Sequence, residues 1–210
     1  MFNISQVFEN GKSLETKNIR VILSDTSWEN IRAARMANLP VYYGNPVSEH
    51  AENHLDLTGI GQMLAISPYK QLNTLSTYHY LDLLGGGNVF GLPEGDQDVR
   101  ASHQSSEKYV QTRNKFDEKA TFAKLASLMS KGASIKTTQL SQAFTFEDYL
   151  KKHGNRLTLL FALKPDKELI PLGQADKLLP QEGWDIISLI QPSPELTELE
   201  KGKKAEAEKN

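Results

Sequence analysis

Asp25 is the residue whose position most favours ligand binding. It lies just past the short apolar run Ile19-Arg20-Val21-Ile22-Leu23, which predicts a strand over residues 19–23 and is followed by Ser24. In a doubly wound sheet the carboxyl ends of the strands open onto the ligand crevice, where an acidic residue accepts hydrogen bonds from ribose hydroxyls. The alternative is an Asp in a turn that leads into a capped helix, which requires no ligand. Position alone leaves both interpretations open.

The sequence lacks the common motifs of pyrophosphate-binding loops and of catalytic sites. A G-x-G-x-x-G loop that holds a pyrophosphate belongs about 20 residues before the acidic position, but only Gly11 lies near there. The Gly85-Gly86-Gly87 run follows a predicted helix instead of opening one. His50 and His54 have a spacing that suits one metal ion, or an ordinary exposed helix face, but lack the H-E-x-x-H order. Because there is also no cysteine and no G-x-S-x-G motif, we expect no enzymatic activity.

Composition narrows the class of protein. The 210 residues are 39% hydrophobic and 24% charged, which is typical of a folded, water-soluble chain. The net charge of −2 argues against nucleic acid as the main partner. No apolar run approaches the roughly 20 residues that span a bilayer. We therefore expect a cytoplasmic protein.

Strands and helices alternate in the first half of the chain. Besides residues 19–23, strands are expected at 41–43, 63–66 and 88–92, and helices at 28–36, 49–57 and from Pro68 to Gly85. Ser27 and Ser48 are suitable N-caps, and the third helix carries Leu72, Leu75 and Tyr78 on one face. Helix-length connections between short apolar strands indicate right-handed crossovers and a parallel sheet. The predicted fold class is α/β.

The sheet looks incomplete at its start. Residues 3–14 have helical spacing where the first strand of a Rossmann-like sheet is expected, so the chain opens as if cut from a longer one. We expect an incomplete Rossmann-like domain over residues 1–94 and a linker over 95–118. A small α+β module over 119–192 and a charged tail over 193–210 follow. The module contains a helix at 119–131, a helix capped by Thr145, a hairpin of strands 157–163 and 168–172, and further strands at 134–140 and 184–190. Core packing is the default expectation for its Trp and Tyr residues and for those of the first half.

A family resemblance adds to this interpretation. The stretch from Asp25 to Met36, followed by Tyr42-Tyr43-Gly44-Asn45 and Ser48-Glu49-His50-Ala51, resembles the cytoplasmic C-terminal region of bacterial monovalent cation–proton antiporters of the sodium/hydrogen exchanger type. That region is similar to the nucleotide-binding RCK, or TrkA-N, domain of potassium channels and transporters. The resemblance covers residues 19–92 and, more loosely, residues 122–190.

The resemblance implies a ligand, a site and partners. Asp25 occupies the ribose-binding position, with Thr26 beside it, and Ser67 matches the loop that lines the crevice. Asn45 stands where the family has Asp, and the first strand with its glycine loop is missing. The implied ligand is an adenine nucleotide such as NAD or AMP. The implied partners are an antiporter transmembrane domain at the inner face of the cell membrane and further copies of the same chain.

Three functions follow from these observations. The first is a regulatory cytosolic domain associated with cation–proton antiport. The second is a stand-alone interaction or assembly domain whose incomplete sheet is finished by another chain, and the third is an NAD-dependent oxidoreductase. Since strands 19–23 and 41–43 are expected to expose unpaired groups, we also expect a dimer or larger species.

Overall fold

The computed structural model of the chain describes residues 14–93, 112, 115–173 and 179–193. Its first half runs β1 (Leu23–Asp25), α2 (Trp28–Met36), β2 (Val41–Tyr43), α3 (Glu49–His54), β3 (Met63–Ala65), α4 (Lys70–Leu84) and β4 (Val89–Gly91). β1 pairs with β2 and β3 pairs with β4, both in parallel. Helices connect the strands of each pair, and this confirms the α/β fold class. Most of the predicted helix at 3–14, most of the linker and nearly all of the tail lie outside the described residues.

The parallel strands form two separate two-stranded sheets, whereas the sequence predicts one sheet. The predicted strand at 19–23 is also wrong in position, because residues 19–22 are unpaired and pairing starts at Leu23. The Leu23 N–H donates to the Pro40 carbonyl at 2.9 Å. Before Pro40 the chain is still leaving α2, and Asn38 has a φ of 61°. On the β2 side, the described residues therefore offer residues 19–22 no extended segment with which to pair.

Capping residues fix the starts of the helices as the sequence predicts. The Ser27 side chain accepts from the Asn30 N–H, and the Ser48 side chain accepts from the Ala51 N–H. Helix α3 ends at His54, earlier than the predicted Leu57, and α4 begins at Lys70. The caps at Ser27 and Ser48 fix where the loops after β1 and β2 end.

The buried face of α4 is not the predicted apolar one. Ser76, Thr77 and Tyr80 are buried, whereas Leu75 and Tyr78 are 58% and 40% exposed. Small hydroxyl side chains allow the helix to approach its neighbours closely, which explains why they lie inward although they are polar. Core packing also fails as the explanation for three further aromatic side chains, which are exposed: Trp28, Tyr43 and Tyr69.

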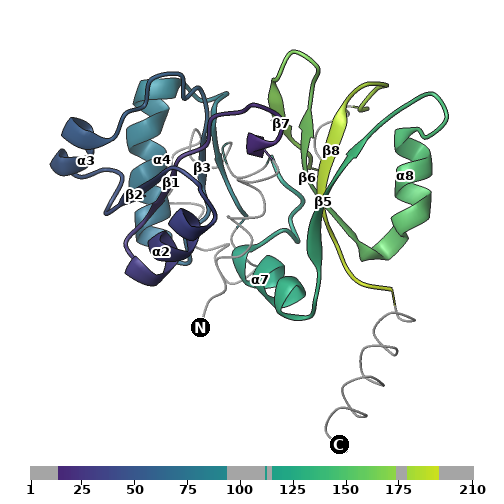
Figure 1. Ribbon diagram of the computed structural model, residues 1–210, viewed down its shortest axis with the longest axis horizontal. Helices are drawn as coiled ribbons and strands as arrows, with labels where there is room; N and C mark the ends of the chain where they lie inside the picture. The colour runs from purple at the N-terminus through teal and green to yellow at the C-terminus, as the bar shows by residue number, and fades with distance from the viewer. Residues whose placement is uncertain (1–13, 94–111, 113–114, 174–178, 194–210) are drawn as a thin grey trace, which may run out of the picture.

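The second half is an antiparallel sheet with two helices. It contains α7 (Phe122–Ser130), β5 (Ser134–Gln139), α8 (Phe146–His153), the 3₁₀ turn η2 (Gly154–Arg156), β6 (Leu157–Leu163), β7 (Leu169–Pro171) and β8 (Asp185–Ile190). The strand order is β5-β8-β6-β7, and every pair is antiparallel. The predicted hairpin is present as β6 and β7. Figure 1 shows this sheet between α8 and the parallel strands.

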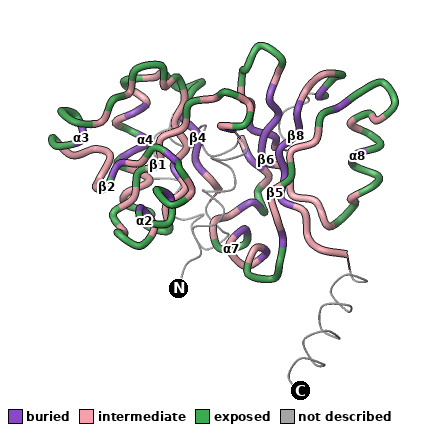
Figure 2. The backbone as a smooth tube through the Cα atoms, in the orientation of Figure 1, coloured by how far each residue is buried: buried purple, intermediate pink, exposed green. Residues whose placement is uncertain are grey.

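Alternate residues of β8 pack on opposite faces of the antiparallel sheet. Ile186 belongs to the cluster that contains Tyr149 of α8, whereas Ile187 and Leu189 belong to the cluster that contains Leu125 of α7. This second cluster also includes Phe90 of β4, so one core joins the parallel strands to the antiparallel sheet. Because both faces are covered, almost the whole of β8 is buried, as Figure 2 shows for the central strands.

Within the described residues, no helix combines the length and the apolar character that crossing a membrane requires.

Candidate functional site

The carboxyl ends of β1 and β2 lie side by side and bring two of the predicted site residues together. Asp25 is in register with Tyr43, and the Gly44 N–H donates to the Asp25 carbonyl at 2.9 Å. Gly44 has a φ of 146°, a conformation that other residues rarely adopt, and a Cβ there would lie 3.1 Å from the Tyr42 ring. The tight turn after β2 therefore requires glycine, and it places Asn45 next to the end of β1.

The Asp25 carboxylate is turned onto the N-terminus of α2. One oxygen accepts from the Ser27 N–H at 2.7 Å and the other from the Asn30 side-chain amide at 2.8 Å. Asp25 thus acts together with Ser27 in capping the helix. A carboxylate offers about four acceptor positions in total, so each oxygen keeps one position for a further donor. The contacts fit the turn interpretation and leave room for the ribose interpretation.

Asn45 and Thr26 have different surroundings. The Asn45 side-chain oxygen accepts from the Val47 N–H at 3.0 Å, and the Asn45 carbonyl accepts from the Ser48 hydroxyl at 2.8 Å. Asn45 therefore organises the turn that precedes α3. Thr26 is exposed between Asp25 and the cap of α2, where its hydroxyl is accessible to a ligand.

Ser67 lies in the other two-stranded sheet, after β3. Its N–H donates to the Asn73 side-chain oxygen at 2.9 Å, and its carbonyl accepts from the Asn73 amide at 2.7 Å. Its hydroxyl accepts from the Tyr69 N–H at 3.1 Å. These bonds hold the loop onto the start of α4. Its position at the carboxyl end of a parallel strand agrees with the prediction, but its role in binding stays a prediction.

A pair of stacked imidazoles flanks the end of β2. The Tyr42 hydroxyl lies 2.9 Å from His50 Nδ1, and the rings of His50 and His54 stack with centroids 4.1 Å apart. His54 Nδ1 donates to the His50 carbonyl at 2.9 Å. Among the residues that the structure describes, no group of three or more His, Cys, Asp or Glu side chains gathers as a metal site requires.

An apolar cavity lies in the core. Leu64, Leu92 and Phe116 line it together with side chains of α7 and the antiparallel sheet. The described side chains that line it are all Leu, Ile or Phe, which would bind neither a phosphate nor a ribose.

Sequence inspection missed two residues at this candidate site. Asn30 contacts the Asp25 carboxylate, and Tyr42 contacts His50. The first had a local signal, because Asn30 follows the N-cap Ser27 by three residues and so lies in the first turn of α2, beside the cap. The contact between Tyr42 and His50 forms only when β2 and α3 pack together, and the sequence spacing did not indicate it.

No family model and no curated protein sequence matches the chain. The solved structures that are similar to it include two at 14% sequence identity each. The crystal structure of the GsuK RCK domain has a TM-score of 0.27 and covers 84% of this chain and 44% of its own. The GsuK channel has a TM-score of 0.34 and covers 88% of this chain and 34% of its own. The present chain therefore matches less than half of the length of either structure.

Proposed function

We propose that the chain is a non-catalytic regulatory module of a monovalent cation transport protein, and that it senses an adenine nucleotide at the carboxyl ends of β1 and β2. The observation that carries the proposal is the juxtaposition of Asp25 with Gly44 and Asn45. Ligands of open α/β sheets bind beyond the carboxyl ends of the strands, and an acidic residue at that place suits two ribose hydroxyls. The resemblance of residues 25–36 to the RCK-type domains of antiporters supports the same site.

The proposal extends to partners. A regulatory module of this kind acts on the transmembrane part of a sodium/hydrogen exchanger type antiporter, at the inner face of the membrane, and assembles with further copies of itself. The exposed side chains of Leu75 and Tyr78 on α4 supply apolar surface for such contacts.

Calorimetric titration with AMP, ATP, NAD and NADH tests the nucleotide site. We expect one of the four to bind, and we expect Asp25→Asn to weaken that ligand at least about tenfold, since a hydrogen bond to a charged group contributes about 1.5–3 kcal/mol. The Asn side-chain oxygen still accepts from the Ser27 N–H, so the helix cap is kept.

Asn30→Ala is the matched control. It removes the other contact of Asp25 but keeps the carboxylate, so nucleotide affinity should stay close to that of the unmodified chain. The proposed site is contradicted if none of the four nucleotides gives a binding signal. It is also contradicted if the Asp25→Asn protein binds a nucleotide as tightly as the unmodified chain does.

A second candidate function is assembly, in which another chain completes the sheet. The separation of the parallel strands into two pairs favours it.

A further inference from the structure

Trp28 and Tyr43 form an aromatic pair that core packing does not explain. Their rings meet edge-on, with the ring centroids 5.5 Å apart. Trp28 is nevertheless 52% exposed and Tyr43 51% exposed. Tryptophan and tyrosine are the residues that most often dominate the energetics of binding surfaces. Two adjoining rings that both remain open to solvent therefore indicate a contact surface for a ligand.

This aromatic pair lies on the same face of the parallel strands as the Asp25 carboxylate. Asp25 and Tyr43 are in register at the carboxyl ends of β1 and β2. The Asp25 carboxylate accepts from the Ser27 N–H at the cap of α2, and the Tyr43 ring contacts Trp28, the first residue of α2. Both side chains are thus directed toward α2, which Figure 1 shows beside these strands. The rings and the carboxylate therefore share the N-terminal end of this helix.

A cation holds the indole ring from the helix side. The Arg35 guanidinium carbon lies 5.6 Å from the centroid of the Trp28 ring, a distance at which a cation is attracted to the face of an indole. Arg35 follows Trp28 by about two helical turns, so both side chains extend from one face of α2. The ring is therefore positioned without being buried. A side chain that is already held in place loses less conformational freedom when a ligand binds to it.

We propose that the Trp28–Tyr43 pair stacks against the base of the nucleotide whose ribose binds Asp25. This inference rests on the proposed nucleotide site and assigns the part of that site that contacts the base. The base is bonded directly to the ribose, so a ribose at the Asp25 carboxylate brings the base to the rings beside it. Stacking on an aromatic side chain recognises the flat face of a base, so this contact requires no polar group at the base.

An NMR titration of the full chain with AMP tests the two parts of the site separately. The ring signals of Trp28 report the base, and the side-chain amide of Asn30, which donates to Asp25 at 2.8 Å, reports the ribose. We expect both to shift, and the Trp28 ring protons to move upfield because the stacked base shields them. Trp184, the second tryptophan of the chain, packs against the cluster that contains Tyr149 and is the internal reference.

Trp28→Leu should weaken AMP binding at least about fivefold in calorimetric titration, since the stacking contact is lost. The side chain is exposed, so the variant should keep its fold. Binding of ribose 5-phosphate, which has no base, should be unchanged by Trp28→Leu and weakened by Asp25→Asn. Trp28→Phe keeps a ring and should retain most of the AMP affinity. Tyr78→Leu is the matched control, because this exposed ring lies on α4, and its AMP affinity should equal that of the unmodified chain.

The outcomes separate this inference from the nucleotide site itself. If the Asn30 amide shifts and the Trp28 ring does not, the stacking contact is overturned and the nucleotide site stands. If neither signal shifts, the nucleotide site is overturned and the stacking contact with it. Equal AMP affinity of the Trp28→Leu protein and the unmodified chain also overturns the stacking contact.

Discussion

The Lys17 ammonium group lies 2.9 Å from both carboxylate oxygens of Asp185, a residue that stands 168 positions later in the chain. Asp185 is the first residue of β8 and is 7% exposed. The contact fastens the beginning of the described chain to the central antiparallel sheet. A buried carboxylate requires such a partner, because an unpaired buried charge is costly.

Lys17→Met should lower the free energy of unfolding by about 1–3 kcal/mol, since it leaves the Asp185 carboxylate without its cation. Urea denaturation measures the loss. Combining Lys17→Met with Asp185→Asn should cost less than the sum of the two single changes, because the second change removes the unpaired charge. Strict additivity would show that the two groups do not interact.

Asp25→Ala should destabilise the chain by about 1 kcal/mol, because the carboxylate caps α2 through the Ser27 N–H and holds Asn30. Thermal unfolding followed by circular dichroism measures the change. Asn30→Ala, which removes one of the two contacts, should cost less. An unchanged melting temperature for Asp25→Ala would contradict the capping role.

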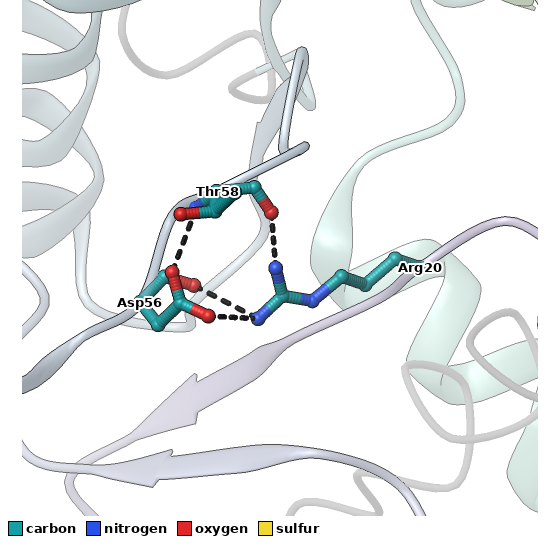
Figure 3. A network of polar contacts seen from close by, with 3 residues as sticks. All are labelled: Arg20, Asp56 and Thr58. Carbon is teal, nitrogen blue, oxygen red and sulfur yellow. Dashed lines mark hydrogen bonds and ion pairs between the residues drawn. The ribbon is translucent and has the colours of Figure 1, made fainter.

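The pKa of Asp56 should be found at about 2, below its ordinary value of 3.8, because the Thr58 side chain and N–H and the Arg20 guanidinium stabilise the charged form. Because its pKa is lowered, the ionised carboxylate stabilises the folded chain at pH values above the ordinary pKa. This contribution is lost as the pH falls from about 4 to about 2. NMR titration of the carboxyl carbon reports the value. Arg20→Met should raise the pKa, because it removes the cation that lies 2.8 Å from the carboxylate (Figure 3), and a value near 3.8 in the unmodified chain would refute the network.

Gly173→Ala should be strongly destabilising, by more than about 2 kcal/mol. A Cβ at this position would lie 2.5 Å from the Lys115 carbonyl oxygen, and backbone cannot move aside as a flexible side chain does. Gly61→Ala is the control, since a Cβ there has no atom within 4 Å. Chemical denaturation should separate the two variants clearly, and similar stabilities would mean that the backbones are further apart.

Leu75→Glu should reduce self-association at micromolar concentration without unfolding the chain. The side chain is 58% exposed on α4, so the change removes apolar surface and costs little stability. Light scattering gives the mass of the species. Leu150→Glu on α8, where the side chain is 38% exposed, is the control and should leave the assembly unchanged. If Leu150→Glu reduced self-association and Leu75→Glu did not, the surface of self-association would lie on the side of the antiparallel sheet.

Local signals were read correctly from the sequence. Ser27 and Thr145 cap helices as predicted, and Thr145 forms a reciprocal capping box with Asp148, because a cap depends only on the next three residues. The run from Leu157 to Leu163 was long and apolar enough to indicate a buried strand. The apolar run before Asp25 likewise indicated that this residue lies at the end of a strand.

Features that depend on distant neighbours were not predictable. The burial of Ser76 and Thr77 depends on what packs opposite α4, and apolar spacing indicated the other face. The division of the parallel strands into two sheets is a tertiary arrangement that no local signal indicates. The contact of Lys17 with Asp185 has no signal in the sequence, since charged residues near both positions offer many alternative partners.

The core that Phe90 of β4 shares with Phe161 of β6 has a mechanical consequence. Both side chains belong to one buried cluster, so a displacement of β4 changes the packing around Phe161. The Phe161 ring also meets Phe116 edge-on, with centroids 5.4 Å apart. A change in the parallel strands therefore reaches the antiparallel sheet through contacts between these core side chains.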